Sequence, residues 1–328
     1  MFLCNSCPPD EMTAATTKDS PRLRLRHSLR LPVIVAPMFL ISGPDLVIAA
    51  CRAGVIGCFP APNARSIEIL EEWCERIAAQ TKGCAAWSLN ILAHSTYKRF
   101  DDELAVVARH RPPLVITALG SPARVTATVH GYGGLVFSDV AQPVHARKAI
   151  DAGADGLVLV CSGAGGHTGK YNPFAFIADV RQFWSGPIVL SGGITNARSI
   201  IAAEVLGADF AYMGTRFIAS QESLGDPARK AMTVEVVMED IVTSAAVTGV
   251  PANWMLPSLR AAGFTDEQIQ STRKSDFSSA ENAKPWKNIW GAGQGVGAVT
   301  RIESTAAIVE GIEAEYRRLL PQGLQMRQ

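Results

Sequence analysis

Two glycine-rich segments carry the residues most able to do chemistry. The first runs Cys161-Ser-Gly-Ala-Gly-Gly-His167-Thr-Gly-Lys170 and places one histidine among four glycines. Histidine suits proton transfer near neutral pH. Glycines let a flat ligand approach the backbone, and this many would be entropically costly in a purely structural loop. We therefore predict that His167 is catalytic; the alternative is a loop histidine bonded to carbonyl groups.

The second glycine-rich signal is a pair of turns that suit an anion. Ser191-Gly-Gly-Ile194 runs into a helix start at Thr195 or Asn196, and Gly214-Thr215 follows a later apolar run. Glycine amides approach an anion closely, and a helix N-terminus adds a positive dipole end. These turns predict a phosphate site, which by itself does not distinguish a flavin mononucleotide from a sugar phosphate.

Two amide side chains extend this picture. Asn90 ends an otherwise apolar run, where a polar group is costly unless it meets a partner. Gln294 lies in a further glycine-rich segment, Gly291–Gly297. We expect no metal site, because Cys4 and Cys7 form a CxxC that has no second pair and no nearby histidine.

The elements that position these residues recur with a regular spacing. Apolar, β-rich runs begin near residues 31, 55, 85, 114, 135, 156, 187 and 210, with helix-like stretches between them. Eight βα units in series predict an α/β fold, a (β/α)8 barrel of the TIM type, in which catalytic residues follow the carboxyl ends of the strands. A doubly wound sheet is the alternative, but no GxGxxG follows its first strand.

The regular spacing stops after about residue 220. We predict a disordered tail at 1–20, a barrel formed by 21–220 and 290–328, and an inserted helical cap or substrate domain at 221–289, with a helix at 227–242 and a closing helix at 300–320. The 328 residues therefore form one barrel with an insertion rather than two independent halves.

Composition excludes several classes of function. The chain has 31 Lys and Arg against 30 Asp and Glu, so it lacks the positive excess that nucleic-acid binding needs. It has no apolar run long enough to span a membrane. Seven scattered cysteines and the absence of a secretory signal favour the cytoplasm.

In combination these motifs resemble the nitronate monooxygenase (2-nitropropane dioxygenase) family of flavin mononucleotide barrels. The likeness rests on Ala36-Pro-Met38, Asn90, Ala164–His167, Ser191–Ile194, Gly207–Phe217 and Gly291–Gly297, in the right order. It implies a non-covalent FMN, with His167 as the catalytic residue. The FMN-binding residues that it implies are Ala36, Pro37, Met38, Asn90, Ser138, Gly165, Gly192, Gly193, Tyr212, Met213, Gly214, Thr215 and Gln294.

The resemblance implies oxidation of alkyl nitronates or nitroalkanes by O2 to a carbonyl compound and nitrite. Separately from the resemblance, we expect a homodimer. The alternative is a flavin reductase of the same barrel family that uses NADH or NADPH, of the enoyl-acyl-carrier-protein or quinone reductase type. A flavin-free aldolase or isomerase is less favoured, because the strand ends carry no Schiff-base lysine and Asp139 stands alone.

Overall fold

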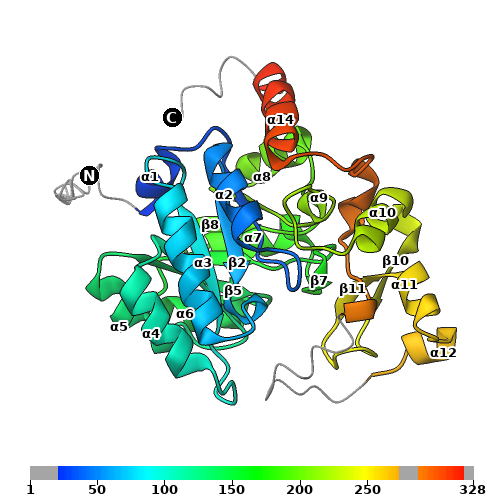
Figure 1. Cartoon of the computed structure of the whole chain (residues 1–328), viewed down its shortest axis with the longest axis horizontal. Helices are drawn as coiled ribbons and strands as arrows, with labels where there is room; N and C mark the ends of the chain where they lie inside the picture. Colours follow the sequence, from blue (N-terminus) through cyan, green and yellow to red (C-terminus); the bar gives the residue numbers. More distant parts are fainter. Residues whose placement is uncertain (1–20, 273–286, 321–328) are drawn as a thin grey trace, which may run out of the picture.

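The computed structural model describes residues 21–272 and 287–320, and its centre is a closed barrel of eight parallel strands (Figure 1). The predicted (β/α)8 barrel is confirmed. The strands follow one another around the barrel in chain order. They are β1 (Val33–Val35), β2 (Ile56–Pro60), β3 (Trp87–Leu92), β4 (Leu114–Ala118), β5 (Leu135–Val140), β6 (Gly156–Leu159), β8 (Ile188–Leu190) and β9 (Phe210–Met213).

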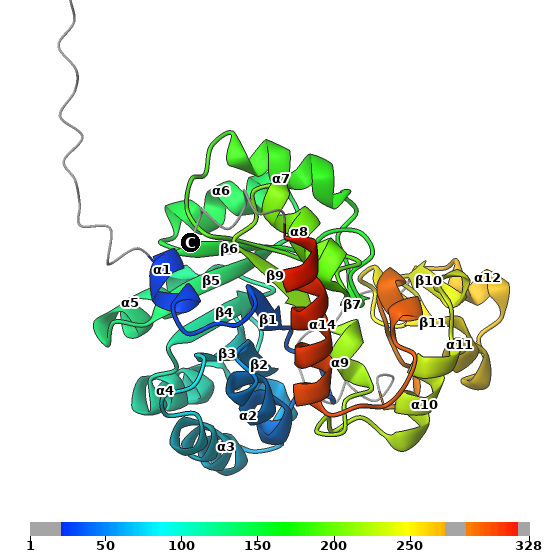
Figure 2. The ribbon, with the colours of Figure 1, turned by 90° about the horizontal axis from the view of Figure 1, so that it is seen from above.

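Helices surround the barrel, and each of the first seven connects one strand to the next. They are α2 (Pro44–Arg52), α3 (Ile67–Gln80), α4 (Phe100–His110), α5 (Ala123–Gly131), α6 (Pro143–Asp151), α7 (Pro173–Arg181) and α8 (Ala197–Val205). The eighth place belongs to α14 (Thr305–Leu319), which packs against α2 and α8 (Figure 2). Buried side chains such as Leu70, Cys74 and Ile77 of α3 share one face and pack on the strands.

Alternate residues of each strand point into the barrel. Ile34, Ile116 and Phe137 belong to the interior cluster, whereas their neighbours pack outward against the helices. This alternation is the period of two that a β-strand imposes. The short helix α1 (Pro21–Arg26) places Leu25 in the same interior cluster.

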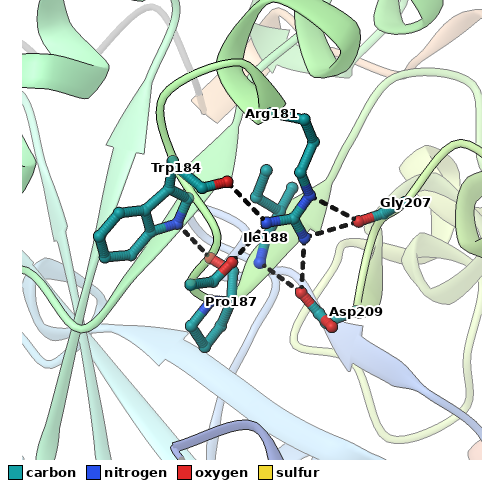
Figure 3. Close-up of polar contacts among 7 residues, drawn as sticks. Arg181, Trp184, Pro187, Ile188, Gly207 and Asp209 are labelled. Carbon is teal, nitrogen blue, oxygen red and sulfur yellow. Dashed lines mark hydrogen bonds and ion pairs between the residues drawn. The ribbon is translucent and has the colours of Figure 1, made fainter. Parts of the chain in front are cut away.

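One arginine fixes the amino ends of β8 and β9, the two strands that lead to the predicted phosphate turns (Figure 3). Arg181, at the end of α7, donates to the Gly207 carbonyl at 2.6 Å and to the Asp209 carboxylate at 2.9 Å. The same carboxylate accepts the Ile188 amide at 2.8 Å. These contacts join the starts of two strands that also pair directly, Val189 with Phe210 and Leu190 with Ala211.

The segment after β9 contains more than the expected helices. It begins with α9 (Thr215–Ile218) and α10 (Pro227–Glu235), so the helix that was predicted over 227–242 ends at Glu235. It continues through β10 (Ile241–Ser244) and β11 (Ala252–Met255) to α11 (Leu256–Ala261) and α12 (Asp266–Ile269). The two antiparallel strands continue onto a third, β7 (Gly166–His167), which belongs to the loop after β6.

Three parts of the domain prediction lie outside the described residues: the tail at 1–20, the stretch 273–286 of the insertion, and the last residues, 321–328. Among the described residues, no helix is both long and apolar enough to cross a membrane.

Candidate active site

A cavity of about 1360 Å³ opens at the carboxyl ends of the barrel strands. This is the end at which barrels of this type place their catalytic residues. The cavity gathers nearly all of the predicted site. The predicted residues that line it are Ala36, Pro37, Met38, Asn90, Ser138, Gly165, His167, Gly192, Gly193, Tyr212, Gly214 and Thr215.

Two predicted residues do not line the cavity. Met213 is fully buried and packs outward, between the barrel and its helices. Gln294 is exposed, and its backbone amide donates to the Gly163 carbonyl at 3.0 Å. The neighbouring Gly293 amide donates to the Thr215 hydroxyl at 2.8 Å. The segment of Gln294 therefore lies across the ends of β6 and β9 and closes that side of the site.

The turn after β8 forms a glycine cradle that is open at Gly193. Gly192 and Gly193 have φ angles of 109° and 73°, which favour glycine. A Cβ at Gly193 would meet nothing within 4 Å, so the backbone faces open space. The amides of Thr195 and Asn196 already donate to the Ser199 hydroxyl. An anion in this cradle would therefore be held by the glycine turn rather than by those two amides.

His167 lies on β7, and pairing with the insertion fixes its place. Its partner in the sheet is Ala252, and Gly166 pairs with Asn253. The Asn253 side-chain amide also donates to the Ala164 carbonyl at 2.7 Å, and the Thr168 amide donates to the Pro251 carbonyl at 3.0 Å. The glycine-rich loop thus has a rigid support, and its histidine faces the cavity from a fixed backbone.

The surroundings of His167 set its protonation state. Burial lowers the pKa of His167 to about 4, because an apolar environment disfavours the charged imidazolium. At neutral pH the ring is uncharged, so one ring nitrogen is able to accept a proton.

Asn90 and Ser138 have structural partners. The Asn90 amide donates to the Ile116 carbonyl on the next strand at 3.1 Å. The Ser138 hydroxyl accepts a hydrogen bond from the Thr117 hydroxyl at 3.2 Å. Ser138 has Val136 and Val140 on its own side of β5, and both pack outward against helices. The inward-facing side chain at this strand end therefore belongs to the next residue, Asp139.

Asp139 is a site residue that the sequence analysis did not select. It lines the cavity, and its Oδ1 has no hydrogen-bond partner among the described residues. Burial raises the pKa of Asp139 to about 7. Burial holds the pKa of Tyr212 well above its usual range, and the neighbouring Asp139 and Cys58 add to that effect. Asp139 faces inward because of the phase of β5, and closure of the barrel sets that phase, so the sequence alone offered no signal that selects Asp139 over Ser138.

Arg229 is the second residue that the sequence analysis missed. It comes from α10 in the insertion and lines the cavity together with Val247, Thr248 and Val250. No sequence signal pointed to it, because its position depends on how the insertion folds back over the barrel.

Cys161 is not suited to nucleophilic chemistry. It is fully buried and outside the barrel interior, and burial raises the pKa of its thiol to about 12. Across residues 21–272 and 287–320, no group of three or more His, Cys, Asp or Glu side chains could hold a metal ion.

The fold and the position of the cavity define a (β/α)8-barrel enzyme whose site lies at the carboxyl ends of the strands. The model of the family described as nitronate monooxygenase matches residues 60–315. The chain belongs to the nitronate monooxygenase family, which is a family of oxidoreductases.

Curated relatives are distant. A putative monooxygenase of Mycobacterium tuberculosis is 27% identical, and the match covers 68% of this chain and 64% of that protein, less than two thirds of its length. A nitronate monooxygenase of Paraburkholderia phytofirmans is 27% identical over 71% of this chain and 75% of its own. A carboxyl-CoA dehydrogenase of Rhodococcus jostii, which acts on a substituted octahydroindene, is 23% identical over 79% and 73%.

Solved structures share the fold. A nitroalkane oxidase from Streptomyces ansochromogenes superposes with a TM-score of 0.78 at 23% identity, and covers 90% of this chain and 98% of its own. FabK from Thermotoga maritima has a TM-score of 0.74 at 24% identity, with coverage of 90% and 95%.

Proposed function

We propose that this protein is an FMN-dependent oxidoreductase of the nitronate monooxygenase type, which oxidises alkyl nitronates or nitroalkanes with O2 to a carbonyl compound and nitrite. The observation that carries the proposal is the position of His167. It faces the cavity as an uncharged base, from a backbone held by pairing with Ala252, and the glycine cradle opens into the same cavity.

The residues present fit FMN. The glycine turn at Gly192 and Gly193, which is open at Gly193, suits its phosphate, together with Gly214 and Thr215 on the neighbouring strand end. The hydroxyl groups of Ser191 and Tyr212 are buried in the cavity wall without hydrogen-bond partners among the described residues, so a bound ligand could satisfy them. When bound, FMN would supply the electron transfer between the substrate and O2.

The chain's own contribution is proton transfer and positioning. With a neutral nitroalkane, a ring nitrogen of His167 takes the proton from the carbon beside the nitro group, and the electron pair of the broken C–H bond moves onto the nitro oxygens. With a preformed nitronate this step is not needed, and His167 only orients the substrate. The paired strands β7 and β11 keep the imidazole in place during the transfer.

A second candidate is an oxidoreductase whose flavin is reduced by NADH or NADPH. It is supported by the similarity to a carboxyl-CoA dehydrogenase over 79% of this chain, because that relative carries out a redox reaction other than nitronate oxidation. This candidate shares the cavity and the cofactor with the first, and differs in the source of the electrons.

Anaerobic mixing distinguishes the two candidates. The purified protein should be yellow, and its absorbance should bleach rapidly when ethyl nitronate is added. With NADH or NADPH at the same concentration, the nitronate monooxygenase type predicts no rapid bleaching. Rapid bleaching by a nicotinamide alone would establish the second candidate. A colourless protein that does not take up FMN would refute both.

A further inference from the structure

Arg229 is a buried cation in the cavity wall. It lies on α10, is 5% exposed and lines the cavity that holds His167. An arginine in such a position is rare in proteins unless an anion or several acceptors compensate its charge.

Among residues 21–272 and 287–320, Arg229 has few groups that compensate its charge. One terminal nitrogen donates to the Gly291 carbonyl at 3.3 Å, and the Nε atom has no hydrogen-bond partner among the described residues. None of the carboxylates in the described ranges forms an ion pair with it, whereas many other arginines of the chain have one. The guanidinium has five N–H donors, so most of its donor capacity remains for a ligand.

The charge persists at neutral pH. Burial lowers the pKa of Arg229 to about 10, which still leaves the guanidinium protonated under ordinary conditions. The cavity therefore carries a fixed positive charge that does not depend on pH across the physiological range.

Backbone contacts through Gly291 and Gly166 connect Arg229 to His167. Gly291, which accepts its hydrogen bond, packs against Gly166: a Cβ on Gly291 would lie 3.3 Å from the Gly166 amide nitrogen. Gly166 directly precedes His167 on β7. A single layer of backbone thus links the base to the buried cation, and both line one cavity.

We propose that Arg229 binds the planar, two-oxygen anionic group of the substrate, and that its positive charge stabilises the anion formed when His167 removes a proton. A guanidinium matches such a group because its parallel N–H donors reach both oxygens. The existence of the anion site follows from Arg229 alone, and the identity of its anion as a nitronate rests on the proposed function. A carboxylate has the same shape and charge and is the other source that the test separates.

Inorganic nitrate is a suitable probe, because it is a planar monoanion that needs no turnover. Its binding to the flavin-loaded protein would be measured by isothermal titration at constant ionic strength, for wild type and for Arg229→Gln, Arg229→Lys and Lys230→Gln. Lys230 is the matched control: it carries the same charge one residue further on, and its ammonium donates to the Gln221 carbonyl instead of lining the cavity.

The expected result is a loss of nitrate affinity of about 10- to 100-fold in Arg229→Gln, the range for a hydrogen bond to a charged group. Arg229→Lys should lose less, and Lys230→Gln should bind like wild type. Equal nitrate affinity in wild type and Arg229→Gln, or no binding to wild type, would overturn the proposal. If Arg229→Gln does not fold, Arg229→Lys decides: an affinity unchanged from wild type contradicts pairing with the planar guanidinium.

Turnover separates this inference from the proposed function. With ethyl nitronate, Arg229→Gln should raise KM by the same factor as it weakens nitrate binding. Acetate and ethyl nitronate would each be tested as competitors of nitrate binding. If acetate is the stronger competitor, the site belongs to carboxylates. A wild-type protein that binds nitrate through Arg229 but oxidises no nitronate would refute the proposed function and leave the anion site standing.

Discussion

Replacement of Asp139 by asparagine should raise the free energy of unfolding at neutral pH and leave it nearly unchanged at pH 4. Asp139 lines the cavity at the end of β5, and burial raises its pKa from 3.8 to about 7. Below pH 3.8 the carboxyl group is protonated in both the folded and the unfolded state. As the pH rises towards 7, the unfolded state releases its proton while the folded state keeps it, so the free energy of unfolding falls.

The size of this effect follows from the two pKa values. They differ by about 3, and at about 1.36 kcal/mol for each pH unit the folded state loses at most about 4 kcal/mol by pH 7. Because the carboxyl group lines an open cavity rather than a sealed core, this is an upper value. An asparagine side chain has nearly the same shape as aspartate and no charge to bury, so Asp139→Asn should recover most of that free energy at pH 8 and almost none at pH 4.

The assay is urea unfolding of wild type and variant at pH 4, 6 and 8, with equal cofactor content. Asp151→Asn, on the exposed part of α6, controls for the loss of one carboxylate. A gain that grows with pH for Asp139→Asn and not for the control supports the reasoning. A difference that stays constant from pH 4 to pH 8 would show that Asp139 ionises as freely in the folded protein as in the unfolded chain.

Three further changes test other parts of the structure. His167→Asn should keep the bound flavin and lower kcat/KM for nitroethane by about 10²- to 10⁴-fold, with a much smaller loss for ethyl nitronate; equal losses for both substrates would contradict a role as base. Because the pKa of His167 is about 4, kcat/KM of the wild type for nitroethane should stay level from pH 8 to about 5 and fall below pH 5. A fall centred near pH 6.5 would contradict the burial of the imidazole ring. Gly214→Asp should abolish flavin binding, because it places a negative charge beside the expected phosphate. Gly214→Ala should retain the flavin, since the added Cβ would lie at ordinary contact distance, 3.5 Å from the Met38 sulfur. Flavin retained by Gly214→Asp would show that the phosphate does not bind at this turn. Arg181→Met should cost about 3–5 kcal/mol in urea unfolding, because it leaves the buried Asp209 carboxylate without its cation; a cost below about 1 kcal/mol would show that the pair does not hold β8 and β9.

The barrel was predictable because its signals are local. Strands buried on both faces read as continuous apolar runs, and the spacing of those runs gave all eight barrel strands. The glycine turns at Gly192 and Gly214 were also visible, because glycine is needed where backbone must lie open to a ligand. The prediction that they gather around one cavity required only that parallel strands present their carboxyl ends on the same side.

The tertiary structure alone decided which neighbouring side chain enters the site. Ser138 and Asp139 are adjacent in a short strand, and the sequence analysis selected the serine. Closure of the barrel sets the phase of β5, which turns Ser138 towards Thr117 and the helices and leaves Asp139 facing the interior. A shift of β5 by one residue would exchange its inward and outward faces, so the sequence alone could not choose between Ser138 and Asp139.

The support of His167 and the presence of Arg229 in the same cavity were also beyond the sequence. The sequence by itself determined a barrel, a glycine cradle and a histidine at a strand end, since each depends on residues close together in the chain. The pairing of His167 with Ala252 and the burial of Arg229 in the same cavity join segments far apart in the chain. Such contacts depend on how the insertion folds back over the barrel, and only the packed structure contains that information.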